Sequence, residues 1–174
     1  MKIFFPEDKD KLRLIKAGEV VEFYGTIYTA RDAAHQRLQE MINNKNELPV
    51  DFSSSFIYYA GPTPTKPGKV IGSIGPTTSS RMDSYAKMMK KLNVIGTIGK
   101  GPRDEACSSF YKDNHILYFV TTGGCGALLS KAVVEAEEIA FLDLGPESIK
   151  RLKVEGFKMI CAIDYMGNDI FGGK

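Results

Sequence analysis

The sequence predicts an α/β fold, in which helices cover a sheet and a smaller β layer lies near the N-terminus. Three observations lead to this prediction. Residues 19–28 are rich in β-branched and aromatic side chains, as strands are. From residue 70 onward, short apolar runs alternate with helical patterns. The run V-I-G-S-I-G at residues 70–75 also returns as V-I-G-T-I-G at residues 94–99, a spacing that suits one strand and one helix.

The composition limits the class of protein. The 174 residues are predicted to form one domain, residues 1–174, because no linker or low-complexity segment divides them. The 23 basic and 21 acidic residues nearly cancel, which argues against a general nucleic-acid binder. No apolar run approaches the roughly 20 residues of a membrane span, and charged residues come too early for a signal peptide. We therefore expect contact with neither nucleic acid nor membrane.

The cysteines Cys107, Cys125 and Cys161 are odd in number and widely spaced. This pattern favours reduced thiols and a cytoplasmic location over a disulfide framework. It also lacks the close cysteine pairs of most iron–sulfur and zinc motifs. We therefore expect that this chain alone holds no metal.

The first helix is predicted over residues 30–44, directly after the strand at 19–28, with Thr29 as its N-cap. Arg31 lies at the start of this helix, away from its apolar face. That face follows helical spacing and consists of Ala30, Ala33, Ala34, Leu38, Met41 and Ile42. The helix is therefore expected to cover the sheet through one stripe.

The sequence leaves two alternatives for the role of His35 and two for residues 61–68. His35 follows Arg31 by one helical turn, and either lines a site with it or serves as a polar helix-face or capping residue. After a short strand at residues 56–60, the three prolines of residues 61–68 predict an ordered turn or a mobile flap.

The second half of the chain is predicted to alternate strands with helices. Its strands are placed at residues 70–74, 94–99, 115–121, about 139–142 and 157–163. Its helices are placed from Arg81 to about residue 92, over about 127–135, and as a short helix that Pro146, Glu147 and Ser148 begin. A turn at residues 164–169 follows the last strand.

The most informative stretch is residues 69–83, K-V-I-G-S-I-G-P-T-T-S-S-R-M-D. A strand that enters a helix through such a loop presents backbone N–H groups and the helix dipole to an anion. Thr77 and Thr78 add hydroxyl groups, and Arg81 adds a guanidinium that fits a carboxylate with two hydrogen bonds. Because crossovers place successive parallel strand ends on one edge of a sheet, the loop that carries Lys100 is expected beside this one.

Arg31, Arg81 and Lys100 each follow a predicted strand, where a cation opposes the helix dipole. Taken singly, each is most simply a solvated surface cation, and Thr77 and Thr78 most simply cap a helix. Three such cations at one end of a sheet predict an acidic ligand that needs several donors, such as a dicarboxylate. The glycine loops match neither G-x-G-x-x-G nor the P-loop pattern, so nucleotide binding is unsupported.

Three segments together indicate a family. T-A-R-D-A-A-H at residues 29–35, G-P-T-T-S-S-R-M-D at 75–83 and I-G-K-G at 98–101 resemble the β-subunit, or C-terminal domain, of class I fumarate and tartrate hydratases. These enzymes are iron–sulfur hydro-lyases. The resemblance covers nearly the whole chain, and it includes the later T-G-G-C-G-A-L-L and D-Y-M-G-N-D-I-F. Two positions depart from the family pattern: Ser80, where glycine is usual, and Cys125, where a small residue is frequent.

The resemblance implies a swivelling β/β/α domain that closes over a partner α-subunit, whose 4Fe–4S cluster is held by three cysteines. The free iron of that cluster would bind the substrate hydroxyl and a carboxylate as a Lewis acid. On the matching positions of this chain, Arg31, Arg81 and Lys100 would grip the substrate carboxylates. Thr77 would be the catalytic hydroxyl that exchanges the proton next to a carboxylate, with Thr78 in support.

Together these observations predict the β-subunit of a two-subunit hydro-lyase, in an α2β2-type assembly, that acts on a small dicarboxylate. Malate and fumarate are the first choice of substrate, and tartrate is the second. The alternative is a stand-alone module that binds a carboxylate or phosphorylated metabolite without catalysis. A gene for a cluster-binding partner beside this one would favour the enzyme, and a lone gene would favour the module.

Overall fold

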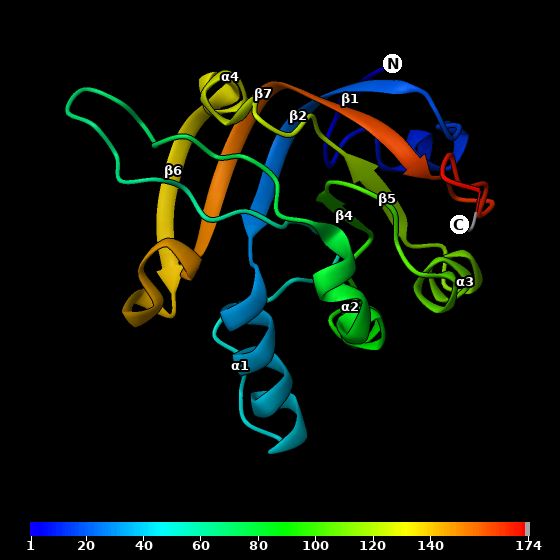
Figure 1. Cartoon of the computed structure of the whole chain (residues 1–174), viewed down its shortest axis with the longest axis horizontal. Helices are drawn as coiled ribbons and strands as arrows, with labels where there is room; N and C mark the ends of the chain where they lie inside the picture. Colours follow the sequence, from blue (N-terminus) through cyan, green and yellow to red (C-terminus); the bar gives the residue numbers. More distant parts are fainter. Residues whose placement is uncertain (173–174) are drawn as a thin grey trace.

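A mixed sheet of seven strands forms the centre of the protein in the computed structural model, which describes residues 1–172 (Figure 1). The strands are β1 (Lys2–Phe4), β2 (Val20–Thr29), β3 (Phe56–Tyr58), β4 (Gly96–Gly99), β5 (Leu117–Val120), β6 (Val133–Ala140) and β7 (Ile149–Ile163). The helices are α1 (Asp32–Asn43), α2 (Ala86–Lys91), α3 (Glu105–Asp113) and α4 (Gly126–Leu129), with 3₁₀ helices η1 (Lys9–Leu14), η2 (Ser79–Tyr85), η3 (Ser130–Ala132) and η4 (Leu142–Glu147).

Five of the strands close into a ring, because β2 pairs with β7 as well as with β3. Strands β2, β3, β4 and β5 run parallel to one another, and β7 runs antiparallel to both β5 and β2. Strands β1 and β6 pair with β2 and β7 outside the ring. The predicted α/β fold with covering helices is confirmed. The smaller β layer expected near the N-terminus is part of the same sheet, because β1 pairs with β2.

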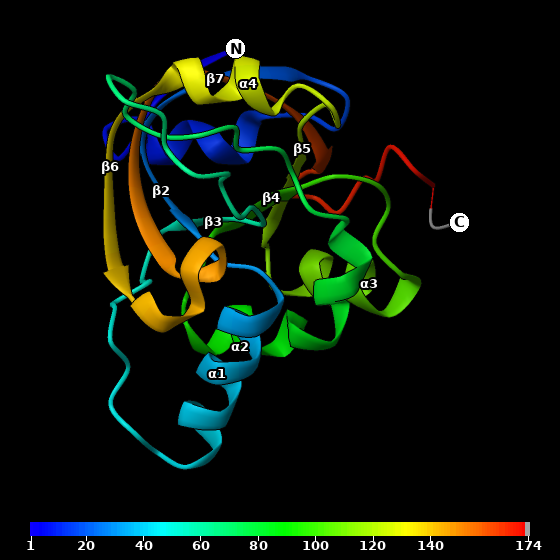
Figure 2. The same cartoon turned by 60° about the vertical axis from the view of Figure 1, so that its left-hand side comes forward.

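The buried side chains form two groups, because successive residues of a strand face opposite sides of a sheet. Phe56 and Tyr58 of β3 belong to the group inside the ring, whereas Ile57 and the adjoining Tyr59 belong to the group beneath the helices. Inside the ring, aromatic side chains meet edge to face, as Phe23 and Phe56 do with their ring centroids 5.0 Å apart. Each fully buried apolar side chain contributes about 1.5–3 kcal/mol to folding. The second group joins the sheet to α1, α2 and α3, which lie together on one side of the ring (Figure 2).

Helix α1 packs on the sheet through the predicted apolar stripe, with Ala34 and Leu38 fully buried. The predicted N-cap is wrong, because Thr29 is the last residue of β2 and its Oγ1 accepts a hydrogen bond from the Lys150 backbone N–H. Instead, the Glu147 carboxylate accepts a hydrogen bond of 2.7 Å from the Ala33 N–H in the first turn. A cap that comes from a residue so distant in the chain has no local sequence signal.

The strand predicted at residues 70–74 does not form. Its backbone bonds to loops: the Thr63 N–H donates to the Ser73 carbonyl, and the Ile74 N–H donates to the Gly126 carbonyl. Ile71 and Ile74 of this segment are buried nonetheless, whereas Val70 is 49% exposed. The apolar run therefore predicted the burial of its two isoleucines, but not the exposure of Val70 or the absence of sheet pairing, which depends on distant partners.

The region after β5 also differs from the prediction. The helix expected over about 127–135 is split between α4 and η3, and β6 begins at Val133. β6 contains glutamate and alanine, which suit a helix, but it is an edge strand whose glutamates form ion pairs with β7. These pairs are Glu135–Lys153 at 2.8 Å, Glu137–Arg151 at 2.5 Å and Glu138–Lys150 at 3.5 Å. Contacts across the sheet have therefore overridden local helix propensity.

The remaining elements agree with the prediction in part. β2, β3, β4 and β5 confirm the strands predicted at the corresponding places, and η2 with α2 confirms the helix that carries Arg81. β7 begins at Ile149, well before the predicted start at residue 157, and the short helix at Pro146 is the end of η4. Helix α3 was not predicted, although Asp104 is a clear N-cap, with its carboxylate 2.6 Å from the Cys107 N–H.

Candidate active site

Thr77 and Thr78 lie where the irregular segment after residue 75 meets the sheet. The Thr77 N–H donates a hydrogen bond of 2.6 Å to the Tyr59 carbonyl, which anchors it at the end of β3. Thr78 forms a parallel bridge with Lys100, directly after β4. The prediction that the two loops lie side by side is therefore confirmed, even though the first of them does not follow a strand.

Ser79 holds these two loops together. Its backbone N–H donates to the Lys100 carbonyl at 2.9 Å, and its Oγ accepts from the Lys100 N–H at 3.1 Å. The contact is possible because Gly99 lacks a side chain: a Cβ there would lie 2.0 Å from Ser79 Oγ. On the other side of the segment, a Cβ at Gly126 would lie 2.5 Å from Ser73 Oγ. These glycines therefore permit close packing of the site loops.

Arg31 and Arg81 meet at a shared aspartate. Asp32 Oδ1 lies 2.9 Å from both Nε and Nη2 of Arg81, and Asp32 Oδ2 lies 3.3 Å from Arg31 Nε. Arg31 Nε also lies 3.4 Å from the Glu147 carboxylate. We call these four residues, Arg31, Asp32, Arg81 and Glu147, the open ionic cluster.

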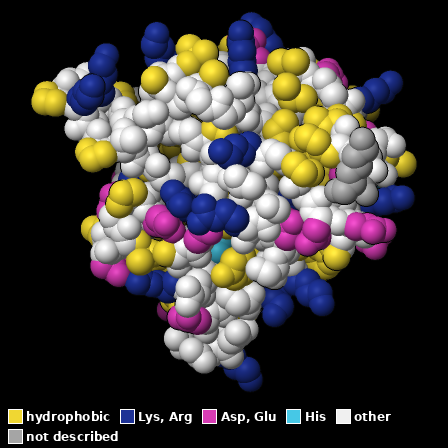
Figure 3. Space-filling model, in the orientation of Figure 1, with side chains coloured by type: hydrophobic (Ala, Val, Ile, Leu, Met, Phe, Trp, Pro, Cys, Tyr) yellow, Lys and Arg dark blue, Asp and Glu magenta, His cyan; other side chains and the backbone are white. Residues whose placement is uncertain are grey.

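The open ionic cluster modifies the argument made from sequence. Asp32 and Glu147 supply negative charge beside Arg31 and Arg81. The positive charge of the two arginines near a helix N-terminus is therefore compensated within this chain. The Arg81 side chain is nevertheless 52% exposed and that of Asp32 is 33% exposed. Exposed ion pairs contribute about 0–1 kcal/mol, so a ligand carboxylate can displace them at little cost. Figure 3 shows basic and acidic side chains gathered side by side in the middle of this face.

Lys100 completes the set of predicted cations. It is partly exposed, and a Cβ at Gly123 would lie 3.7 Å from Lys100 Cδ, so the loop after β5 flanks its side chain. The structure thus brings Lys100 next to Thr78, and Arg81 next to Arg31. Thr77, Thr78 and Arg81 belong to one short segment, and the other two predicted site residues, Lys100 and Arg31, lie beside it.

His35 is fully buried, so it is not a polar residue of the helix surface. Its Nδ1 bonds to the Arg31 carbonyl at 2.9 Å, and its ring packs against Tyr59 and Tyr85. Burial lowers the pKa of His35 to about 4. The neutral imidazole therefore donates Nδ1–H to Arg31 and helps to hold the start of α1 in place.

Arg103 is a residue of the site region to which the sequence assigned no role. Its guanidinium is buried, pairs with Asp83, and donates a hydrogen bond of 3.1 Å to the Tyr59 hydroxyl. The buried groups around it, which we call the buried polar layer, are Ser79, Asp83, Arg103, Tyr59, Tyr111 and Tyr118. An arginine in a Gly/Pro loop is usually exposed, so its burial had no signal in the sequence.

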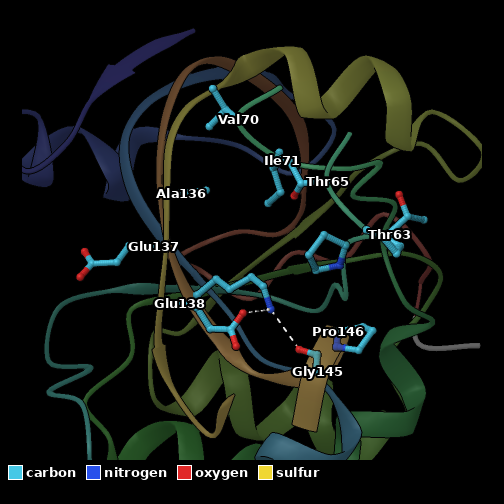
Figure 4. A pocket seen from close by; sticks show the side chains of 12 residues that line it. Thr63, Thr65, Val70, Ile71, Ala136, Glu137, Glu138, Gly145 and Pro146 are labelled. Atoms are coloured by element: carbon cyan, nitrogen blue, oxygen red, sulfur yellow. Dashed lines mark hydrogen bonds and ion pairs between the residues drawn. The ribbon is translucent and has the colours of Figure 1, made fainter. Parts of the chain in front are cut away.

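Two cavities lie on another side of the segment, beside β6. One of about 350 Å³ lies between residues 62–71 and the strand β6 with η4, and Figure 4 shows Thr63, Ile71 and Pro146 on its walls. The other, of about 550 Å³, lies between the same loop and α4 with η3. Neither is lined by Arg31, Thr77, Thr78, Arg81 or Lys100. The predicted site is thus an open surface of this chain and not one of these cavities.

The environment of two of the three cysteines bears on metal binding. Cys107 and Cys161 are buried, and burial raises the pKa of each thiol to about 12, which disfavours the thiolate that a metal requires. In residues 1–172, no group of three or more His, Cys, Asp and Glu side chains lies close enough to hold a metal ion. The helices of the same residues are also too short or too polar to cross a membrane.

Comparison with known proteins identifies the family. A family model described as "Fumarase C-terminus" matches residues 2–173. The chain belongs to this family. The family predicted from the three sequence motifs is thereby confirmed.

Curated relatives divide into two kinds by length. The "Putative L(+)-tartrate dehydratase subunit beta" of Methanocaldococcus jannaschii is 39% identical over 169 residues, which cover 94% of this chain and 87% of the relative. The L(+)-tartrate dehydratase subunit beta of Escherichia coli is 35% identical over 174 residues, covering 95% and 83%. Fumarate hydratase 2 of Leishmania major is 36% identical over 170 residues, but the match covers only 30% of that longer protein.

Proposed function

We propose that this chain is the β-subunit of a two-subunit hydro-lyase that interconverts a 2-hydroxydicarboxylate and its dehydrated form. Fumarate and malate are the first pair of substrates to test, and tartrate with oxaloacetate is the second. Family membership and two relatives of similar length, both named as β-subunits of tartrate dehydratase, support the enzyme over the stand-alone binding module. The structural observation that supports the proposal is that Arg31 and Arg81 share Asp32, while the backbone of Lys100 is bridged to Thr78, three residues before Arg81.

The residues of this chain bind and orient the dicarboxylate. Arg81 and Arg31 exchange their pairing with Asp32 for one substrate carboxylate, and Lys100, whose backbone is bridged to Thr78, binds the other carboxylate. The Thr77 hydroxyl then transfers the proton at the carbon next to a carboxylate. Nearby positive charge favours the deprotonated form of such a hydroxyl, and Arg81 and Lys100 supply that charge.

The partner α-subunit completes the site. We place the 4Fe–4S group on the partner, where it would supply Lewis-acid chemistry; the burial of Cys107 and Cys161, which raises the pKa of both thiols, supports this placement. The open position of the ionic cluster supports this arrangement, since a surface site needs a second wall to exclude water from the substrate. An α2β2-type assembly in the cytoplasm is the form that we propose.

The first experiment is anaerobic co-purification with a candidate cluster-bearing subunit, followed by an assay of fumarate loss for the complex and for this chain alone. We expect activity only in the complex. A stable complex that is inert to fumarate directs the test to tartrate and then to mesaconate. Failure to form a complex, combined with carboxylate binding by this chain alone, would overturn the proposal in favour of the binding module.

The second experiment tests the cations. Arg81→Ala is expected to lower kcat/KM of the complex by about 10²–10³-fold, because a charge that positions the substrate is lost. Arg151→Ala is the matched control, since the Arg151 side chain is 54% exposed and is paired with an acid, Glu137 of the edge strand β6. Near-normal kinetics of Arg81→Ala would contradict the proposal that Arg81 binds a substrate carboxylate.

A further inference from the structure

The ion pair between Arg103 and Asp83 is enclosed by the protein. The Arg103 side chain is 0% exposed and that of Asp83 is 6% exposed, with Nε and Oδ1 2.5 Å apart. The second carboxylate oxygen of Asp83 accepts a hydrogen bond of 2.9 Å from the Asp104 N–H. Since Asp83 lies in η2 and Asp104 precedes α3, the pair joins the two segments that follow the site loops.

Three tyrosine rings surround the Arg103 guanidinium. Its Cζ lies 5.4 Å from the ring centroid of Tyr59, 5.0 Å from that of Tyr111 and 5.2 Å from that of Tyr118. Among residues 1–172, no group accepts a hydrogen bond from Arg103 Nη2. Burial of a charge with incomplete hydrogen bonding is costly, and apolar residues of similar volume are often as stable. General stability is therefore a poor explanation for this arginine.

The members of the buried polar layer are linked to the proposed substrate-binding residues. Asp83 is two residues after Arg81, and Arg103 is three residues after Lys100. The Tyr118 hydroxyl lies 2.7 Å from the Gly101 carbonyl and 2.8 Å from Ser79 Oγ, so it donates to the first and accepts from the second. Each of the two loops is thereby held on the same buried framework.

We propose that Arg103 and Asp83 are positioning residues, which set the separation between Arg81 and Lys100 that a dicarboxylate requires. This inference rests on the proposed function, in which Arg81 and Lys100 bind the substrate. Lysine cannot replace Arg103, because a single ammonium group cannot serve Asp83 and the Tyr59 hydroxyl with the fixed geometry of a guanidinium.

The test is a double-mutant cycle in the reconstituted complex, at a temperature at which every variant is folded. Arg103→Lys alone is expected to lower kcat/KM by about 10–100-fold, because a displacement of about 1 Å at the reacting centre can cost that much. In the Arg81→Ala background the same change should cost less than about threefold, since there is no longer a spacing to set. Effects that multiply fully in the double variant, or a single variant with unchanged kcat/KM, would overturn the inference.

Arg37→Lys is the matched control. Arg37 also pairs with an aspartate, Asp143, with two contacts of 2.7 Å, and its Cζ also lies over an aromatic ring, 4.9 Å from the centroid of Phe141. This pair lies on the surface away from the site loops, so kcat/KM is expected to stay within about twofold of the wild type. A drop as large as that of Arg103→Lys would show a general effect of losing an arginine, and would overturn the positioning role.

Amide hydrogen exchange of the full chain separates this inference from the proposed function. Arg103→Lys is expected to speed exchange at the Ser79 and Lys100 amides by about tenfold or more, because both bond across the loop junction, and to leave Phe23 in the ring unchanged. If Arg103→Lys does not fold, Tyr118→Phe tests the same junction, because it removes only the bridging hydroxyl. Unchanged exchange at Ser79 and Lys100 would overturn the inference, even if the complex proved inactive on every dicarboxylate.

Discussion

Two arginine–aspartate pairs lie close to the proposed site, and they differ mainly in solvent exposure. Arg103 and Asp83 have side chains that are 0% and 6% exposed, whereas those of Arg81 and Asp32 are 52% and 33% exposed. A buried charge that loses its partner cannot be rescued by water, but an exposed charge is solvated at once. The first pair therefore holds the framework in one arrangement, while the second can exchange its partner for a ligand.

The largest expected effect comes from breaking the buried pair. Arg103→Ala leaves the Asp83 carboxylate without its partner, and we expect the free energy of unfolding to fall by about 3–5 kcal/mol. Urea denaturation of the full chain measures this change. The double variant Arg103→Met with Asp83→Leu should recover part of the loss, because no uncompensated charge remains. A loss below about 1 kcal/mol in Arg103→Ala would remove the contrast between the two pairs.

The second effect depends on pH and on His35, which borders the buried polar layer. Its pKa is about 4 in the folded protein and about 6.5 when unfolded, so the unfolded chain binds the extra proton between these values. The stability that His35 contributes is therefore fully present above pH 6.5 and decreases as the pH falls, by about 3 kcal/mol at pH 4. Denaturation curves from pH 7 to pH 4 measure this dependence.

The control for this prediction uses the other histidine. His35→Gln removes this group and should flatten the pH dependence, and His115→Gln, at an exposed position, is the matched variant for comparison. A curve for His35→Gln that falls as steeply as the wild type between pH 6.5 and pH 4 would contradict the assignment.

A smaller loss is expected where the two site loops touch. In Gly99→Ala the new methyl group would meet Ser79 Oγ at 2.0 Å, so the loops must move apart, at a cost of about 1–3 kcal/mol. Thermal unfolding measures the cost, and kcat/KM of the complex should fall as well. Gly68→Ala is a control in open space, although its positive φ adds some backbone strain. Wild-type activity of Gly99→Ala would show that the spacing of the loops matters little.

The smallest effect on stability is expected from the exposed pair. Arg81→Ala should change the free energy of unfolding by at most about 1 kcal/mol, because water and Arg31 still solvate or neutralise Asp32. Urea denaturation of this variant beside Arg103→Ala makes the comparison directly. A loss of several kcal/mol would mean that the open ionic cluster is structural, and would weaken its assignment to a substrate.

Some of the site followed from the sequence because its signals are local. Thr77, Thr78 and Arg81 lie on one short segment, and Lys100 directly follows β4, a strand that the apolar run at residues 94–99 predicted. Two other segments depend on contacts with residues that are distant in the chain, and local sequence patterns predicted their secondary structure wrongly. β6 contains residues that suit a helix, yet its charged face pairs with β7, and Ile71 and Ile74 of the apolar run at residues 70–74 are buried without entering the sheet.

By itself, the sequence determined the α/β class, the apolar face of α1, four of the strands and the family to which the chain belongs. Only the tertiary structure determined which charged side chains pair with each other and which are buried. It placed Asp32 against Arg81, Glu147 at the start of α1, and Arg103 inside a cage of tyrosines. The physical reason is that a periodic pattern reports the faces of one element, whereas the partner and the exposure of a charge depend on elements that are distant in the chain.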